Sequence, residues 1–326
     1  MQIELPGFFD LQVNGFAGVD FNAPGLTADR VTEALERMRA TGVTRCLPTL
    51  ITSSFERFAS NARVLARMSH PSIAGLHMEG PYISPEDGAR GAHAAGHVIP
   101  ASVDDFARRQ DAADGLILLV TLAAETPGAL HLIEHLVRAG VRTAIGHTAA
   151  SPLQIADAIS AGATLATHLG NGCAQNLPRH PNVIWELLAA DRVFASLIVD
   201  GHHLPPSTVK AMVRAKDPRW TILVTDAIAA AASAPGDYTI GDVTCTLGED
   251  GRVSLPGTPY LAGSNLTMDR AIGNAARFTG LPIDQVTAMA SSIPASYLGM
   301  HAAGRVIADW NPATYELRVQ SAQSSA

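Results

Sequence analysis

Apolar and polar positions along the chain form a repeating order of short apolar runs and longer amphipathic segments. The runs are rich in β-branched residues and indicate buried strands, whereas the segments between them indicate helices. This alternation is typical of βα units around a parallel sheet. The eight predicted strands are Phe8–Asn14, Val43–Leu50, Ile73–Glu79, Leu116–Leu122, Arg142–Thr148, Thr164–Leu169, Val193–Val199 and Thr221–Asp226. The predicted helices are Thr27–Thr41, Ser54–Ser69, Val103–Ala112, Thr126–Ala139, Ser151–Ala161, Val183–Ala190 and Pro206–Ala215.

Several helix ends carry boundary signals. Thr126-Pro127 and Ser151-Pro152 each place a hydroxyl at an expected N-cap and a proline at the first helical position. Gly140 and Gly162 follow the last helical residues, where left-handed C-caps are expected. These signals support the boundaries drawn from the hydrophobic pattern.

Eight strand–helix alternations favour a closed (β/α)₈ TIM-type barrel of the α/β class over an open sheet. The segment Tyr238–Leu255 instead alternates apolar and polar residues around Gly-Asp and Asp-Gly pairs, which indicates a β-hairpin. We therefore expect a β insertion at about 236–258, after the eighth strand. Two more helices are predicted near Thr267–Thr279 and Pro282–Ala290.

The predicted division places the barrel in residues 1–303 and the remnant of a small β domain in residues 304–320. Residues 321–326 are small and polar, and a disordered tail is expected there.

Composition narrows the possible functions. Of the 326 residues, 47% are hydrophobic and 16% charged, and the net charge of −7 argues against a nucleic-acid partner. Cys46, Cys173 and Cys245 lie far apart and suggest neither a disulfide framework nor a cysteine-rich metal site. No basic stretch precedes an apolar run at the N-terminus, and no apolar run approaches about 20 residues. The sequence therefore predicts a cytoplasmic protein without a membrane partner.

Polar side chains with catalytic chemistry stand where predicted strands end. Glu79, His147, His168 and Asp226 each close a strand, and His202 and His203 follow another. In a (β/α)₈ barrel the carboxyl ends of all strands face one mouth, where active sites are built. The set therefore predicts a single site rather than scattered residues.

Each of these residues also has a structural interpretation. One histidine at a strand end is more often a hydrogen-bonded turn residue than a ligand, and Asp226 alone could cap the following element. His77 lies two residues before Glu79, one layer deeper, and a structural role is favoured for it. The pattern alone assigns surface positions to His93, His97, His131, His135, His180 and His301.

The combination of Glu79, His147 and His168 favours a metal site. One carboxylate and two imidazoles supply three ligands and leave a position open for water, as catalytic zinc requires. A metal so held lowers the pKa of bound water from about 15.7 toward about 7. Asp226 could then transfer protons, and His203 could donate to the developing oxyanion. The chemistry is metal-assisted hydrolysis of an amide or similar carbonyl, and these residues alone name no substrate.

The ordered motifs resemble the amidohydrolase superfamily and, within it, the N-acetylglucosamine-6-phosphate deacetylase family. The resemblance covers roughly residues 6–308. It rests on Pro6-Gly-Phe-Phe-Asp-Leu-Gln-Val-Asn-Gly15, His77-Met-Glu-Gly-Pro-Tyr-Ile-Ser84, Gly91-Ala-His93, Gly146-His-Thr148, Thr167-His-Leu169, Asp200-Gly-His-His203, Val224-Thr-Asp-Ala227 and Leu261-Ala-Gly-Ser264. Single motifs are weak signals, but their order is specific.

The resemblance implies roles residue by residue. Glu79, His147 and His168 look like the metal ligands, and Asp226 looks like the catalytic acid and base. His203 resembles the histidine that polarises the acetyl carbonyl. For the substrate, the resemblance implies contacts from His93, Asn171, Gly172, Arg179 and Leu261, with Asn171, Gly172 and Arg179 at the phosphate. It thereby replaces the surface interpretation of His93.

Many amidohydrolases carry His-x-His on the first strand and bind two metals. Gln12 and Asn14 occupy those positions here, and neutral amides are poor zinc ligands beside imidazole. We therefore expect one divalent ion per subunit. Zinc is the expected ion, with iron or another divalent ion as the alternative.

The chain departs from the family pattern in three places. The family reads Thr-His-Leu-Phe/Tyr-Asn-Ala-Met, but Gly170 replaces the aromatic residue here, which is expected to loosen the pocket near the sugar. Arg179-His-Pro-Asn182 stands where the family has Arg-Glu-Pro-Gly, which affects phosphate recognition. Family members also have a longer segment before the first barrel strand, so a reduced or absent β-sandwich is expected.

Three functions remain open from the sequence. The first hypothesis is hydrolysis of N-acetyl-D-glucosamine 6-phosphate to glucosamine 6-phosphate and acetate by a homodimer. The second is deacetylation of the galactosamine isomer, an unphosphorylated N-acetyl sugar or an N-acyl amino acid. The third is a non-catalytic protein that binds a sugar phosphate. A small-molecule amino-sugar phosphate is thus the expected partner.

Overall fold

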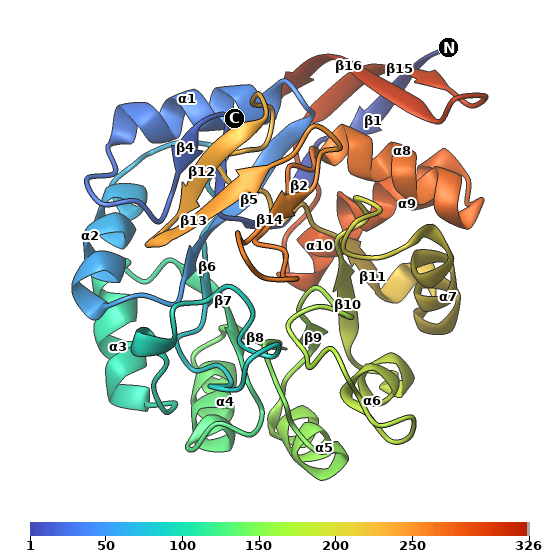
Figure 1. Ribbon diagram of the computed structural model, residues 1–326. Helices are drawn as coiled ribbons and strands as arrows, with labels where there is room; N and C mark the ends of the chain where they lie inside the picture. The colour runs from blue at the N-terminus through green and yellow to red at the C-terminus, as the bar shows by residue number, and fades with distance from the viewer. Residues whose placement is uncertain (325–326) are drawn as a thin grey trace.

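The eight predicted barrel strands are confirmed in the computed structural model, which describes residues 1–324 (Figure 1). They are β2 (Phe8–Val13), β5 (Val43–Ile51), β6 (Leu76–Glu79), β7 (Ile117–Leu122), β8 (Arg142–Ile145), β9 (Leu165–Ala166), β10 (Phe194–Leu197) and β11 (Thr221–Leu223). They lie in the order β11-β10-β9-β8-β7-β6-β5-β2, and every neighbouring pair is parallel. The expected (β/α)₈ barrel is therefore present.

Helices surround this sheet in Figure 1, and the predicted helices are confirmed with small shifts at their ends. They are α1 (Ala28–Arg39), α2 (Phe55–Ala66), α3 (Val103–Ala112), α4 (Ala129–Arg138), α5 (Pro152–Ala161), α6 (Val183–Ala189), α7 (Pro206–Lys216), α8 (Met268–Thr279) and α9 (Ile283–Met289). Three elements are additional: α10 (Ser292–Tyr297) and the 3-10 helices η1 (Ala95–His97) and η2 (Pro218–Trp220). No helix within residues 1–324 has the length and apolar character needed to cross a membrane.

The two predicted N-caps have different outcomes. Ser151 caps α5 in a full capping box with Gln154, as its sequence indicates. Thr126 does not cap α4, which begins after Gly128 at a positive φ of 85°. A Cβ at position 128 would lie 2.3 Å from the carbonyl oxygen of Ala101, so the close approach of the chain there delays the helix.

The seam between β2 and the residues after β11 closes the barrel. The Asp226 amide donates to the Gln12 carbonyl at 2.9 Å, and the Asn14 amide donates to the Ala227 carbonyl at 2.7 Å. Below these bonds, the buried carboxylate of Asp10 accepts the Thr225 hydroxyl at 2.5 Å. The first and last strands of the barrel are thus joined by both backbone and side chain.

The predicted β insertion is a three-stranded antiparallel sheet of β12 (Gly236–Ile240), β13 (Val243–Leu247) and β14 (Val253–Ser254). Its apolar side packs on Ile51 and Ile228, which belong to the same cluster of buried side chains as Cys245 and Val253. A two-stranded turn of β3 (Gly15–Phe16) and β4 (Val19–Asp20) lies beside it. Asp20 joins the two, because its carboxylate accepts the Gly241 amide at 2.8 Å.

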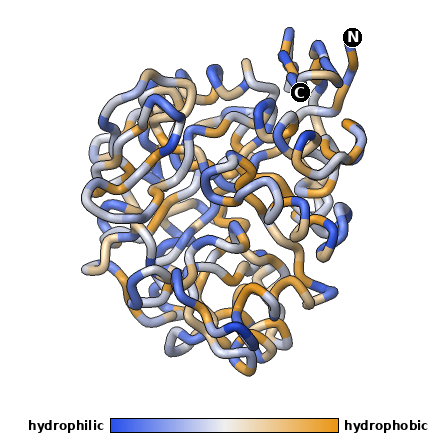
Figure 2. Tube along the Cα trace, turned by 45° about the vertical axis from the view of Figure 1, so that its right-hand side comes forward, coloured by the Kyte–Doolittle hydropathy of each residue, from blue (hydrophilic) through white to orange (hydrophobic). Residues whose placement is uncertain are grey.

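A separate sheet contains β15 (Arg305–Asn311) and β16 (Glu316–Gln323), and it also takes β1 (Gln2–Pro6) from the other end of the chain. Figure 2 shows these strands standing out from one edge of the molecule. The sequence prediction missed β1, although Gln2-Ile-Glu-Leu5 alternates polar and apolar residues.

The prediction of a disordered tail from Ser321 is wrong as far as Gln323. There the backbone pairs with β15 in the register Val306↔Ala322 and Arg305↔Gln323, and backbone hydrogen bonds do not require apolar side chains. Residues 325 and 326 lie outside the described part of the chain. The domain boundaries themselves stay a prediction.

Asp10 makes the stability of the fold depend on pH. Burial raises the pKa of Asp10 from 3.8 to about 7, against hydrogen bonds from Thr225 and Gln12 that lower it. The stability gained from the bound proton is complete below about pH 4 and is lost as the pH rises through 7. Between pH 5 and 8 we expect the unfolding free energy to fall more steeply for the wild type than for Asp10→Asn. The difference should reach a few kcal/mol, since each pKa unit is worth about 1.4 kcal/mol.

Urea unfolding of both proteins at several pH values measures this difference. Asp20, whose pKa burial raises to about 6, is present in both proteins and its effect cancels. Parallel stability curves would show that Asp10 has an ordinary pKa in the folded protein.

Candidate active site

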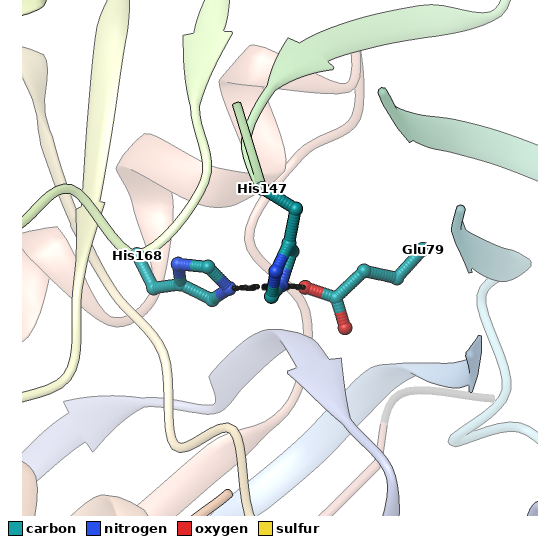
Figure 3. Close-up of side chains that lie close together, drawn as sticks. All are labelled: Glu79, His147 and His168. Carbon is teal, nitrogen blue, oxygen red and sulfur yellow. Dashed lines mark hydrogen bonds and ion pairs between the residues drawn. The ribbon is translucent and has the colours of Figure 1, made fainter. Parts of the chain in front are cut away.

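Three side chains from the ends of β6, β8 and β9 converge at the mouth of the barrel. Glu79 is the last residue of β6, and His147 and His168 follow β8 and β9 by two residues each. Figure 3 shows the two imidazole rings and the carboxylate pointing to one place. His147 Nε2 lies 3.2 Å and His168 Nε2 3.1 Å from Glu79 Oε1, and the two nitrogens are 3.0 Å apart.

The backbone at the site is strained. His147, His168 and Asp226 have φ values of 50°, 30° and 49°, in the left-handed region that non-glycine residues seldom occupy. Such conformations persist only where the surroundings over-determine them, and they cluster at functional sites. The three residues share this conformation directly after parallel strands, where it turns each side chain toward the mouth.

The donor set suits a divalent metal ion. Ligand atoms about 2.1 Å from a tetrahedral ion lie about 3.4 Å from one another, close to the separations among Glu79, His147 and His168. His147 Nδ1 can donate to the Ala89 carbonyl oxygen at 3.0 Å, and in that tautomer the Nε2 lone pair is available to a metal ion. Burial alone would raise the pKa of Glu79, but hydrogen bonds from the two histidines hold it well below its usual range.

Asp226 stands beside this set on the seam of the barrel. Its Oδ1 accepts the Asn14 side-chain amide at 2.6 Å and the Gln12 side-chain amide at 3.2 Å. Gln12 also donates to Glu79 Oε1 at 2.8 Å, so it bridges the two carboxylates. Burial, with a further contribution from the charge of Glu79, raises the pKa of Asp226 from 3.8 to about 7. Asp226 can therefore both accept and release a proton near neutral pH.

Two further histidines are fixed by partners that sequence reasoning missed. His203 Nδ1 is 2.7 Å from Asp200, whose pKa is lowered, against its burial, by the hydrogen bond and charge of His203. His93 Nδ1 is 2.8 Å from the Thr52 hydroxyl, and burial lowers the pKa of His93 to about 3. Asp200 was visible in the Asp-Gly-His-His motif, but nothing in the sequence pairs Thr52 with His93.

His77 has the structural position expected for it. It lies one layer below Glu79, with Nε2 2.8 Å from the Thr121 hydroxyl, which in turn is 2.7 Å from the Thr167 hydroxyl. Burial lowers the pKa of His77 to about 4, so the ring is neutral. The network holds the strands beneath the metal set together without adding charge.

A cavity of about 350 Å³ opens over these groups. Its lining includes Glu79, His147, His168 and Asp226, and also five residues predicted to contact substrate: His93, Asn171, Gly172, His203 and Leu261. Arg179 is exposed and does not line it. The described residues that line the cavity include no lysine or arginine.

Gly170 stands where the family pattern has an aromatic residue, and two apolar side chains pack against it. A Cβ at position 170 would lie 2.9 Å from Leu204 Cδ2 and 3.0 Å from Met212 Cε. These two side chains fill the space into which a side chain at this position would extend. The lost aromatic residue is thus offset by the packing of its neighbours.

Comparison with known proteins agrees with this geometry. The amidohydrolase family model matches residues 3–309. The N-acetylglucosamine-6-phosphate deacetylase of Bos taurus is 33% identical over 312 residues, which cover 90% of this chain and 74% of the relative. That of Bacillus subtilis is also 33% identical, over 91% of this chain and 75% of the relative.

Solved structures give the same result. The N-acetyl-D-glucosamine-6-phosphate deacetylase of Mycobacterium smegmatis, in complex with N-acetyl-D-glucosamine 6-phosphate, superimposes with a TM-score of 0.90 at 31% identity. The match covers 98% of this chain and 86% of that one. The enzyme of Pasteurella multocida matches with a TM-score of 0.87 at 27% identity, over 99% of this chain and 86% of that one.

The close approach of Gly172 to the histidines yields a prediction. A Cβ at this position, where φ is 56°, would lie 3.0 Å from both His147 Nδ1 and His168 Cε1. Gly172→Val should therefore displace the rings and weaken binding of a divalent metal by about 10- to 100-fold. Competition with a chelator measures the affinity. Gly96→Val is the matched control, because a Cβ at Gly96 meets no atom within 4 Å. Equal affinities for the two variants would contradict the prediction.

Proposed function

We propose a reaction for this chain, which belongs to the amidohydrolase family, among the N-acetylglucosamine-6-phosphate deacetylases. The reaction is hydrolysis of N-acetyl-D-glucosamine 6-phosphate to glucosamine 6-phosphate and acetate. The family resemblance read from the motifs is thereby confirmed, as is an enzyme of the metal-dependent amide hydrolase type. One observation carries the proposal. A Glu–His–His set and a carboxyl group with a pKa near 7 face the same cavity.

We propose that Glu79, His147 and His168 hold one zinc ion, for which their donor atoms and separations are suitable. A bound zinc ion would supply Lewis acidity to the amide carbonyl and lower the pKa of a water molecule. Gln12 and Asn14, which stand where many amidohydrolases carry two more histidines, are engaged with the carboxylates of Glu79 and Asp226. This engagement favours a single metal ion.

The protein side chains would manage the protons and the developing charge. Asp226 takes a proton from the attacking water and delivers it to the leaving nitrogen, which its pKa near 7 permits in both directions. Asp200 accepts from His203 Nδ1 and fixes the ring at the cavity wall, where His203 would polarise the acyl oxygen. His93, Asn171, Gly172 and Leu261 would contact the sugar from the cavity wall.

A cationic side chain would bind the phosphate, and the described residues that line the cavity supply no lysine or arginine. Arg179 lies two residues beyond Leu177, which does line it, and the Arg179 side chain is exposed. We propose that the protein is a cytoplasmic homodimer in which Arg179 of one subunit reaches the phosphate in the cavity of the other. Arginine can grip a phosphate through two hydrogen bonds.

A second function shares the chemistry but changes the substrate. The second hypothesis covers an unphosphorylated N-acetyl sugar, the galactosamine isomer and an N-acyl amino acid. The absence of lysine and arginine among the described lining residues favours the unphosphorylated sugar, because the other two substrates are anions. A purely binding role has less support, because a binder has no use for a carboxyl group tuned to neutral pH.

Substrate preference tests the proposal. We expect kcat/KM for acetate release to be at least about 100-fold higher for N-acetylglucosamine 6-phosphate than for N-acetylglucosamine, or about 2.7 kcal/mol. Arg179→Ala should raise KM mainly for the phosphorylated sugar, whereas Arg192→Ala, an exposed arginine before β10, should leave both substrates unaffected. Little preference in the wild type would favour the second function. An equal effect of Arg179→Ala on both sugars would remove it from the phosphate site.

Two substitutions separate proton transfer from metal binding. Asp226→Asn should lower kcat by about 10²- to 10⁴-fold while zinc content stays near one ion per subunit. Glu79→Ala should abolish the bound zinc, because it removes the only carboxylate of the set. Elemental analysis and acetate release measure both quantities. Near-normal turnover in Asp226→Asn, or full zinc content in Glu79→Ala, would remove the residue from its role.

A further inference from the structure

Two carboxamides at the end of β2, Gln12 within it and Asn14 directly after it, donate to one oxygen of Asp226. Asn14 Nδ2 donates to Asp226 Oδ1 at 2.6 Å, and Gln12 Nε2 donates to the same oxygen at 3.2 Å. All three side chains are buried, with exposed fractions of 2% for Gln12, 1% for Asn14 and 8% for Asp226. In residues 1–324, Oδ2 of Asp226 accepts no hydrogen bond, so the two oxygens have different surroundings.

The barrel seam fixes this arrangement. Gln12 and Asn14 are two residues apart on an extended segment, so both side chains point to the same side. The backbone bonds Asp226 N–H to Gln12 carbonyl and Asn14 N–H to Ala227 carbonyl set the height of the carboxyl group between them. The amides therefore meet Asp226 without a loop whose movement could release them.

The orientation of each amide is also determined. Gln12 uses both hydrogens of Nε2, one on Glu79 Oε1 at 2.8 Å and one on Asp226 Oδ1, and a flip would set its oxygen against two carboxylates. Asn14 has its carbonyl oxygen buried without a partner while its nitrogen donates to Asp226. Leaving a buried acceptor unpaired is costly, and the short hydrogen bond to Oδ1 offsets that cost.

Hydrogen atoms from two N–H donors already point at Oδ1, so a proton on that oxygen would be opposed by both. We propose that Gln12 and Asn14 are positioning residues that reserve Oδ1 as a fixed acceptor and leave Oδ2 of Asp226 as the oxygen that exchanges the proton. The proposal rests on the deacetylation proposed above. It assigns to two neutral amides a function in the reaction beyond their exclusion of a second metal ion.

The proton balance is simple. As water attacks the acetyl carbon, an O–H bond of the water breaks and its proton passes to Oδ2. When the C–N bond breaks, its electron pair goes to nitrogen, the Oδ2–H bond breaks and a new N–H bond forms. Asp226 returns to the carboxylate, still held through Oδ1, and no further reactant is required.

Removal of one donor tests the role. In Asn14→Leu the carboxylate loses a charge-assisted hydrogen bond, so its ionised form is less stable and its reactive oxygen is no longer fixed. We expect kcat for the preferred substrate to fall about 10- to 100-fold, with KM within about threefold of the wild type. The acidic limb of the pH profile of kcat/KM should move upward by about one unit.

The matched control is Asn61→Leu. Asn61 is equally buried and donates to the carbonyls of Phe21 and Ala23, away from Asp226. It should lower the unfolding free energy without moving the pH profile. Zinc content and circular dichroism of both variants, in the metal-loaded protein, separate a misplaced proton donor from a lost metal or fold.

Asn14→Asp keeps the shape of the side chain if Asn14→Leu fails to fold. It replaces the donating nitrogen by an oxygen facing Oδ1, so the pH profile should move in the same direction and kcat should fall at least as far. An unshifted acidic limb in a folded, zinc-loaded variant, Asn14→Leu or Asn14→Asp, would overturn the positioning role. Failure of the wild type to release acetate from any amide would instead overturn the proposed function, so the two results are distinguishable.

Discussion

Closure of the barrel between β2 and the residues after β11 is the constraint on which the site depends. Two backbone hydrogen bonds, Asp226 to Gln12 and Asn14 to Ala227, bring the first strand and the last strand together. They place Asp226 beside the mouth of the barrel. Glu79, His147 and His168 reach the same mouth from the ends of β6, β8 and β9. Without this seam Asp226 would lie at one edge of an open sheet, and Gln12 and Asn14 at the other.

Neutral groups balance the buried charges of the site. Glu79 and Asp226 are both buried acids, and the amide of Gln12 lies between them rather than a cation. The layer beneath is a neutral histidine with threonine hydroxyls, and the tautomer of His147 is set by a backbone carbonyl. An additional fixed charge beside Asp226 would shift its pKa away from neutrality further than the amide dipoles do, which orient the carboxyl group with a smaller effect.

The sequence predicted the parts of this structure that depend on periodicity. Strands and barrel helices follow from hydrophobic repeats, and the strand ends pointed to Glu79, His147, His168 and Asp226, which the structure brings together. It could not predict the pairing of Thr52 with His93, or the absence of Arg179 from its own cavity, because both depend on how distant loops approach each other. The start of α4 was missed for the same reason, since a carbonyl of a remote loop decides it.

The sheet that unites β1 with β15 has a consequence for how the chain is made. Glu4 pairs with Ile307, and within residues 1–324 β1 pairs with no strand but β15, so this pairing waits until about 300 further residues have been synthesised. At roughly 5–20 residues per second on a ribosome, this wait is on the order of 15 to 60 seconds. The barrel can assemble in order during that time, whereas β1 must stay free of wrong partners. Its residues Gln2 and Glu4 are polar and exposed, which keeps the waiting strand soluble and leaves the final pairing to the arrival of the chain's end.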